Sequence, residues 1–175
     1  PDGVASSWKI MLRVIGTVAQ LHKLGVVHGD LKPANVIVDS DAQPSLIDFG
    51  LASRGLAHDA LHASGTPAFM APELFRGQVS SRSTDIYALG ATLWCIVTGL
   101  APLEEFGAQA LSMKLRGVLP RLPQGVNDES RRLLEVALAT LADDARERPK
   151  SADELAAAIE RATGDQPHHQ LDALG

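Results

Sequence analysis

The alternation of apolar and polar residues in the first part of the chain follows the period of an α-helix. Between residues 7 and 24, apolar residues fill most positions and leave one polar stripe, formed by Lys9, Arg13, Thr17 and Gln20. A helix with a single polar stripe buries most of its circumference. Ser6 and Ser7 are N-cap candidates and Gly25 is a stop signal, so the pattern predicts a largely buried helix over residues 7–24.

Three short apolar runs predict strands after this helix. They are Val26–Val27, residues 36–38 and residues 45–47. Residues 39–44 carry the polar and proline residues typical of a turn, so the last two runs should form a hairpin. Because polar stretches border this hairpin on both sides, it would hold two acid-bearing loops close together.

Later segments are again helical in pattern. A helix from about Asp85 to Gly99 would be roughly 21 Å long, too short for about 30 Å of hydrocarbon, so the charge-free run 86–103 predicts a core helix. Further helices are indicated after Pro72-Glu73-Leu74, at Leu134, Ala137, Leu138 and Leu141, and at a Ser151–Glu154 capping box that turns Leu155 and Ile159 inward. The pattern predicts a mainly α fold (α+β) with one short hairpin.

Residues 51–70 lack any sustained period. An irregular segment of this length inside a compact domain is usually functional. We expect one domain over residues 1–163 and a flexible tail over residues 164–175, because no periodic pattern continues past Gly164.

Composition narrows the class of protein. The chain has 175 residues, 45% of them hydrophobic, which is enough for one real core. A net charge of −5 argues against nucleic acid or an anionic membrane as a partner. Cys95 is the single cysteine, so no disulfide can form within the chain, and no secretory signal pattern is present. We therefore expect a cytoplasmic protein, whose parent could be tethered to a membrane outside this segment.

The densest group of polar residues lies between the first helix and the hairpin. His28-Gly29-Asp30-Leu31-Lys32-Pro33-Ala34-Asn35 contains a histidine, an acid, a lysine and an amide, and Asp48-Phe49-Gly50 follows the hairpin. With Ala71-Pro72-Glu73 in the same order, these motifs resemble the C-terminal lobe of a eukaryotic-type (Hanks-type) serine/threonine protein kinase. The alanine-rich loops are typical of a bacterial member of that family.

The resemblance implies a role for each motif residue. Asp30 would orient the accepting hydroxyl and Lys32 would add a cation, while Asn35 and Asp48 would hold Mg2+ or Mn2+, with ATP as co-substrate. Gly65 and Thr66 would lie in the segment that docks a protein substrate. Support would come from His28, Phe49, Gly50, Glu73 paired with Arg148, and Asp85 bonded to the catalytic-loop backbone; Ser53, Ser64 and Thr66 are candidate phosphorylation sites.

The chain departs from the family at two places. Gly29 stands where many kinases have an arginine that binds an activating phosphate, so we expect activation by another route. No glycine-rich phosphate loop, strand lysine or partner-helix glutamate precedes Ser7. We therefore expect the chain to lack the N-terminal lobe and to be inactive without it.

The sequence also allows three other interpretations. His58 and His62 flank an acid at the spacing of a zinc-protease helix, although such a site needs glutamate beside the first histidine and a third ligand. The His-Gly-Asp-Leu and Ile-Asp-Phe-Gly motifs also resemble aminoglycoside and choline phosphotransferases, whereas Lys32, Gly65-Thr66 and Ala71-Pro72-Glu73 favour a protein substrate. A non-catalytic pseudokinase-like binding module is the third alternative, against which the intact Asp30, Asn35 and Asp48 argue.

Overall fold

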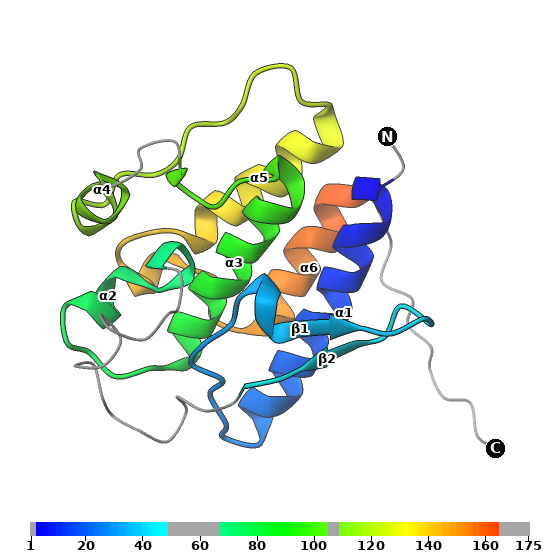
Figure 1. Ribbon diagram of the computed structural model, residues 1–175, viewed down its shortest axis with the longest axis horizontal. Helices are drawn as coiled ribbons and strands as arrows, with labels where there is room; N and C mark the ends of the chain where they lie inside the picture. Colours follow the sequence, from blue (N-terminus) through cyan, green and yellow to red (C-terminus); the bar gives the residue numbers. More distant parts are fainter. Residues whose placement is uncertain (1–2, 49–66, 105–108, 165–175) are drawn as a thin grey trace.

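The fold is mainly helical, as the sequence pattern predicts. The computed structural model describes residues 3–48, 67–104 and 109–164. Its α-helices are α1 (Gly3–Lys23), α2 (Pro72–Phe75), α3 (Arg82–Thr98), α4 (Ala110–Leu115), α5 (Asp128–Thr140) and α6 (Ala152–Thr163) (Figure 1). Short 3-10 turns are η1 (Pro33–Asn35), η2 (Pro67–Phe69) and η4 (Ala145–Glu147). The strands β1 (Val36–Val38) and β2 (Pro44–Leu46) pair antiparallel, with Val36 opposite Leu46.

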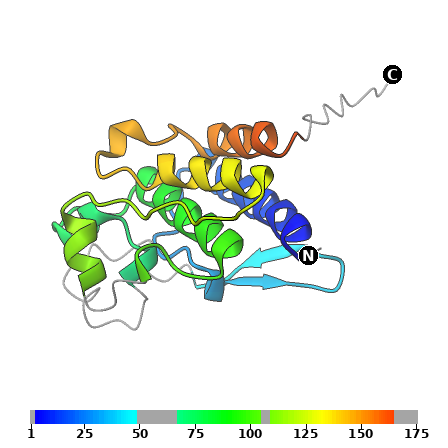
Figure 2. The ribbon, with the colours of Figure 1, turned by 90° about the horizontal axis from the view of Figure 1, so that it is seen from above.

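Helix α3 is the centre of the core. It packs against α1 and α5, and α6 packs against both of those helices. Figure 2 shows α5 and α6 on one side of the molecule and the hairpin on the other. Every residue of α3 from Thr84 to Trp94 is buried, which confirms the core helix predicted from the charge-free run. Because α3 is buried on all sides, its polar side chains are held in fixed positions and can bond to the surrounding loops.

Glycine is required where α3 approaches α5. A Cβ atom on Gly90 would lie 1.3 Å from Oγ1 and 2.4 Å from Cβ of Thr140. Thr140 is fully buried, and its hydroxyl donates to the Ala137 carbonyl at 2.6 Å. The Thr140 side chain therefore packs directly against the backbone of Gly90.

We predict that Gly90→Ala lowers the free energy of unfolding by about 1–3 kcal/mol, because overpacking forces the two helices apart. Urea denaturation measures the loss. Gly16→Ala is a matched control, since Gly16 lies in α1 with nothing within 4 Å of the added atom; it should stabilise by about 0.5–1 kcal/mol. Adding Thr140→Gly to the Gly90 variant should recover part of the loss. Equal stability of the two alanine variants would contradict this account of the contact.

Several predicted boundaries are wrong. The predicted strand at Val26–Val27 is absent, because the Val26 N–H donates to the Leu21 carbonyl and closes the end of α1. Helix α1 starts at Gly3 instead of residue 7, and β2 starts one residue earlier than predicted. At Ser151 only half of the predicted capping box forms: its side chain accepts from the Glu154 N–H, but the Glu154 carboxylate accepts from the Lys150 N–H.

The described helices include none that combines the length and the apolar character needed to cross a bilayer. Residues 51–66 of the irregular segment and residues 165–175 of the predicted tail lie outside the described residues. Residues 67–69 of that segment form η2, followed by Met70, Ala71 and α2.

Candidate active site

The loop between α1 and η1 is fixed to the core by Asp85 of α3. The Asp85 carboxylate accepts from the backbone N–H groups of His28 and Gly29, each at 2.9 Å. These are the contacts predicted for Asp85, and the side chain is 1% exposed. Gly29 has a φ of +81°, a conformation that costs other residues free energy and glycine almost none. The loop is thus tied to the most buried helix without backbone strain at Gly29.

Sequence reasoning missed a third group at this anchor. His22 Nε2 lies 2.9 Å from Asp85 Oδ2, and the imidazole is buried in the last turn of α1. The signal was available, because His22 follows Met11, Ile15 and Val18 at helical spacing and so falls on the buried face of α1. A polar residue on that face needs a partner, and Asp85 is that partner.

Asp30, Lys32 and Asn35 converge within the loop. Asp30 Oδ2 accepts from Lys32 Nζ at 2.8 Å and from Asn35 Nδ2 at 3.0 Å, and Asn35 Nδ2 also donates to the Asp30 carbonyl at 2.7 Å. His28 Nδ1 accepts from the Asp30 N–H at 3.3 Å. Lys32 and Asn35 therefore hold Oδ2 in place, and within the described residues Oδ1 of Asp30 accepts no hydrogen bond.

Asn35 and Asp48 are brought together by the hairpin. The Ile47 N–H donates to the Asn35 carbonyl at 3.0 Å, which places Asp48 beside Asn35 at the open end of the sheet. Asp48 is exposed and has a φ of +60°, an uncommon conformation for a residue other than glycine that is often found at functional sites. Asn35 uses its amide nitrogen on Asp30, which leaves its amide oxygen and the Asp48 carboxylate as two candidate hard oxygen donors.

This pair fits Mg2+ better than a zinc ion. Mg2+ takes one or two protein oxygens and completes its shell with water and phosphate, whereas a zinc site needs three or four protein ligands. Among the described residues, no cluster of three or more histidine, cysteine or acidic side chains is placed to hold a metal. His58 and His62, the zinc alternative, lie outside the described residues.

The predicted ion pair between Glu73 and Arg148 is present. Arg148 Nη1 and Nη2 donate to the two Glu73 carboxylate oxygens at 2.7 and 2.8 Å, and Nε donates to the Ala142 carbonyl at 2.8 Å. The guanidinium also lies 5.0 Å from the ring centroid of Tyr87. Arg148 is 1% exposed, so this bidentate pair joins α2 to the segment before α6 inside the core.

A cavity opens beside Asp30. It is lined by the loop before η1, α3, η2 and the start of α2, including Gly29, Asp30, Phe69, Met70 and Ala71. The site therefore has a wall made from the last residues of the irregular segment and the residue that follows it. Phe49, Gly50, Ser53, Ser64, Gly65 and Thr66, all predicted to belong to the site, lie outside the described residues.

Comparison with known proteins decides the family. The family model described as the protein kinase domain matches residues 5–158 of the chain. The chain belongs to the protein kinase family. The serine/threonine-protein kinase mos of Patiria pectinifera is 36% identical over 169 residues, covering 90% of this chain and 47% of that relative. The predicted membership in the Hanks-type serine/threonine branch is confirmed.

Bacterial serine/threonine-protein kinases are similar to this chain at comparable levels of identity. PknK of Mycobacterium bovis is 33% identical over 137 residues, covering 74% of this kinase chain and 12% of the relative. PknD of Chlamydia caviae is 32% identical over 178 residues, covering 90% and 19%. The kinase chain therefore spans less than half the length of these relatives.

Proposed function

We propose that this kinase chain carries the phosphate-accepting side of an active site that transfers the γ-phosphate of ATP to serine and threonine hydroxyls of proteins. The observation that supports this most strongly is the state of Asp30. Its Oδ2 is fixed by Lys32 and Asn35, its Oδ1 accepts no hydrogen bond from the described residues, and the loop is tied to Asp85. Phosphoryl transfer depends mainly on such positioning and on compensation of charge.

Asp30 orients the substrate hydroxyl in this proposal. The hydroxyl oxygen bonds to the γ-phosphorus, the bond to the ADP oxygen breaks, and the hydroxyl proton passes toward Oδ1 of Asp30. Lys32 Nζ, 2.8 Å from Oδ2, offsets the negative charge gathered around the transferred group. His28 is buried behind the loop and acts through its hydrogen bond to the Asp30 N–H.

Asn35 and Asp48 would hold the magnesium ion. When bound, Mg2+ neutralises phosphate charge and orients the phosphates. Because Asn35 also donates to Asp30, a single side chain links the metal ligands to the hydroxyl-orienting acid. A shift of Asn35 would therefore displace both the magnesium ligand and the Asp30 carboxylate.

The rest of the nucleotide site would come from an N-terminal lobe. Ile37 pairs with Ser45 in the hairpin register, and Ile47 is bonded to Asn35, so Ile37 and Ile47 share the face that carries Asn35. They are 54% and 37% exposed, whereas Val36 and Leu46 on the other face pack against the core. An exposed apolar face beside a phosphate site suits a lobe that brings a nucleobase, and without it we expect the chain to be inactive.

Activation would not run through a phosphate clamp at the catalytic loop. Gly29 donates only its backbone N–H, to Asp85, and has no side chain for a phosphate on Ser53, Ser64 or Thr66. The loop is bonded to α3 through the backbone N–H groups of His28 and Gly29. A phosphate on Thr66 would instead interfere with substrate docking in this proposal.

The substrate class is tested by giving the full-length protein γ-labelled ATP and Mg2+ with a generic basic protein, an aminoglycoside and choline in parallel. We expect label on serine or threonine of the basic protein and none on the small molecules. Label on the aminoglycoside or on choline would identify a small-molecule phosphotransferase. ATP binding without transfer to any acceptor would favour the pseudokinase-like alternative.

A further inference from the structure

The short helix α4 is attached to the kinase core by an unexpected side chain. Its one buried residue is Lys114, which is 5% exposed. Helices of globular proteins bury apolar side chains, and an ammonium group removed from water costs free energy unless its hydrogen bonds are replaced. Lys114 therefore places a charged group at a position where an apolar side chain is usual. Its hydrogen-bond partners explain this choice.

Three backbone carbonyl groups surround the Lys114 ammonium. Nζ donates to the carbonyl oxygens of Pro67, Ala68 and Met70 at 2.7, 2.8 and 2.9 Å. The ring centroid of Tyr87 lies 5.1 Å from Nζ. An ammonium has three N–H donors, so all of them are used on one short segment. No carboxylate of the described residues lies within ion-pair distance of Nζ.

The segment held in this way is a wall of the candidate active site. Residues 67–70 comprise η2 and Met70, and both Phe69 and Met70 line the cavity that contains Asp30. Fixing the carbonyl groups of Pro67, Ala68 and Met70 fixes the direction in which the intervening side chains and N–H groups point. Lys114 thereby affects the cavity beside Asp30 only through residues 67–70, because it does not line the cavity itself.

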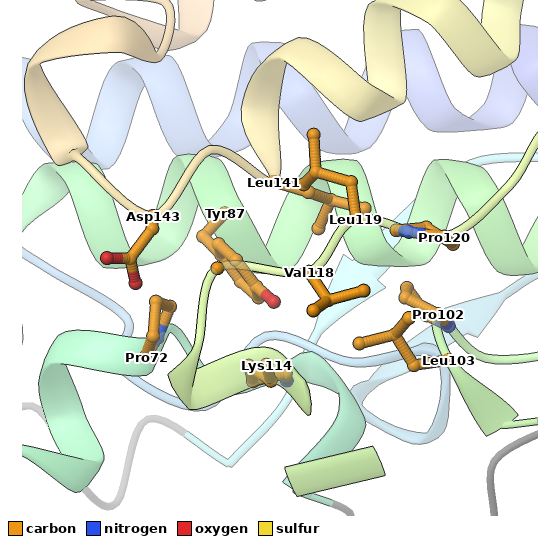
Figure 3. Close-up of a pocket in the computed structure, with 11 residues that line it drawn as sticks. Pro72, Tyr87, Pro102, Leu103, Lys114, Val118, Leu119, Pro120, Leu141 and Asp143 are labelled. Atoms are coloured by element: carbon orange, nitrogen blue, oxygen red, sulfur yellow. The ribbon is translucent and has the colours of Figure 1, made fainter. Parts of the chain in front are cut away.

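A second small pocket borders Lys114. Figure 3 shows the residues that line it, which come from α3, α4 and the loop of residues 117–120 and include Tyr87, Lys114 and Val118. Among the described residues, one further side-chain hydrogen bond joins α4 to another element, from Arg76 to the Leu115 carbonyl at 3.0 Å. Lys114 is therefore the main link between α4 and the segment of residues 67–70.

We propose that Lys114 is a positioning residue, which ties α4 to residues 67–70 and so sets the shape of the wall on which a protein substrate docks beside Asp30. This inference rests on the proposed function. The three carbonyl oxygens that accept from Nζ all belong to residues 67–70. The ammonium therefore fixes the local geometry of this segment.

The charge state of Lys114 sets the conditions of the test. Burial lowers the pKa of Lys114 to about 7, because desolvation disfavours the charged form. A neutral amine has two N–H donors for three carbonyl groups, so it cannot satisfy all of them. The measurement belongs at a pH of about 6, where the ammonium form dominates.

The test is amide hydrogen exchange in the full-length protein, comparing wild type with Lys114→Met and Lys114→Arg. Methionine keeps the length and drops all donors, and arginine keeps charge and donors. In Lys114→Met we expect exchange about 10-fold faster or more at residues 68–76 and in α4, with α1 and α5 unchanged. In Lys114→Arg, which keeps the charge and the donors but replaces a compact ammonium with a larger planar group, we expect a smaller increase than in Lys114→Met. Lys114→Gln, with two donors, replaces the methionine variant if that does not fold, and should lie between the two.

Unchanged exchange at residues 68–76 in the methionine variant, or equal loosening of all helices, would overturn the inference. A second readout is kinetic: Lys114→Met should raise the KM for a protein substrate about 10-fold and leave the KM for ATP within about 2-fold. If wild type transfers no phosphate to protein, the proposed function fails. The exchange result then still decides whether Lys114 positions the segment.

Discussion

Replacing Arg148 with alanine should lower the free energy of unfolding by about 3–5 kcal/mol, the largest stability loss that we expect from a single substitution in this chain. The variant leaves the Glu73 carboxylate, 7% exposed, without its bidentate partner. It also removes the donor to the Ala142 carbonyl. A buried charge without a partner costs far more than the pair itself contributes. Urea denaturation followed by circular dichroism measures the effect.

Arg146→Ala is the matched control for this prediction. Arg146 also pairs with an acid, Asp144, at 2.7 Å, but its side chain is 90% exposed, and exposed pairs contribute little. The double variant Arg148→Met with Glu73→Leu removes both charges and should recover most of the loss. Equal stability of Arg148→Ala and Arg146→Ala would show that burial of the Glu73 pair does not govern the stability of this domain.

Asp30→Asn should lower kcat for transfer to protein in the full-length kinase by about 10²–10⁴-fold. Asparagine keeps the shape of the side chain and can still accept a hydrogen bond, but it offers no carboxylate to the substrate hydroxyl. The loop should keep its geometry, because its hydrogen bonds to Asp85 use the backbone of His28 and Gly29. Steady-state kinetics with a basic protein substrate would give kcat and both KM values.

Asp41→Asn is the control for Asp30, since it makes the same chemical change at an exposed position in the turn between β1 and β2. It should leave kcat within about 2-fold. A fall of about 2-fold or less in Asp30→Asn would contradict the role assigned to this carboxylate.

The elements of the fold that depend on local patterning could be predicted from the sequence. The polar stripe of α1 and the charge-free run of α3 both correspond to real burial, because the period of hydrophobicity reports directly which face meets the core. The β1–β2 hairpin was also predictable, since two apolar runs flank a short turn. The same reasoning failed at Val26–Val27, where β-branched residues indicate a strand but the end of α1 uses the Val26 N–H.

Contacts between distant residues could be predicted only through the family resemblance. The bonds from Asp85 to the catalytic loop and from Arg148 to Glu73 join segments 56 to 75 residues apart, and no periodicity encodes them. His22 and Lys114 could not be predicted in this way, because neither belongs to a kinase motif. His22 could have been found on the apolar face of α1. Lys114 could not, because the partners of a lysine that bonds only to backbone carbonyl groups leave no mark in the sequence.

A structure of the full-length protein with Mg2+ and a non-hydrolysable ATP analogue would test whether Asp30, Asn35 and Asp48 form one phosphoryl-transfer site on this chain. We expect the Asn35 amide oxygen and the Asp48 carboxylate to coordinate Mg2+, and Oδ1 of Asp30 to face the terminal phosphate. A nucleotide bound elsewhere, or a metal that contacts neither Asn35 nor Asp48, would contradict it.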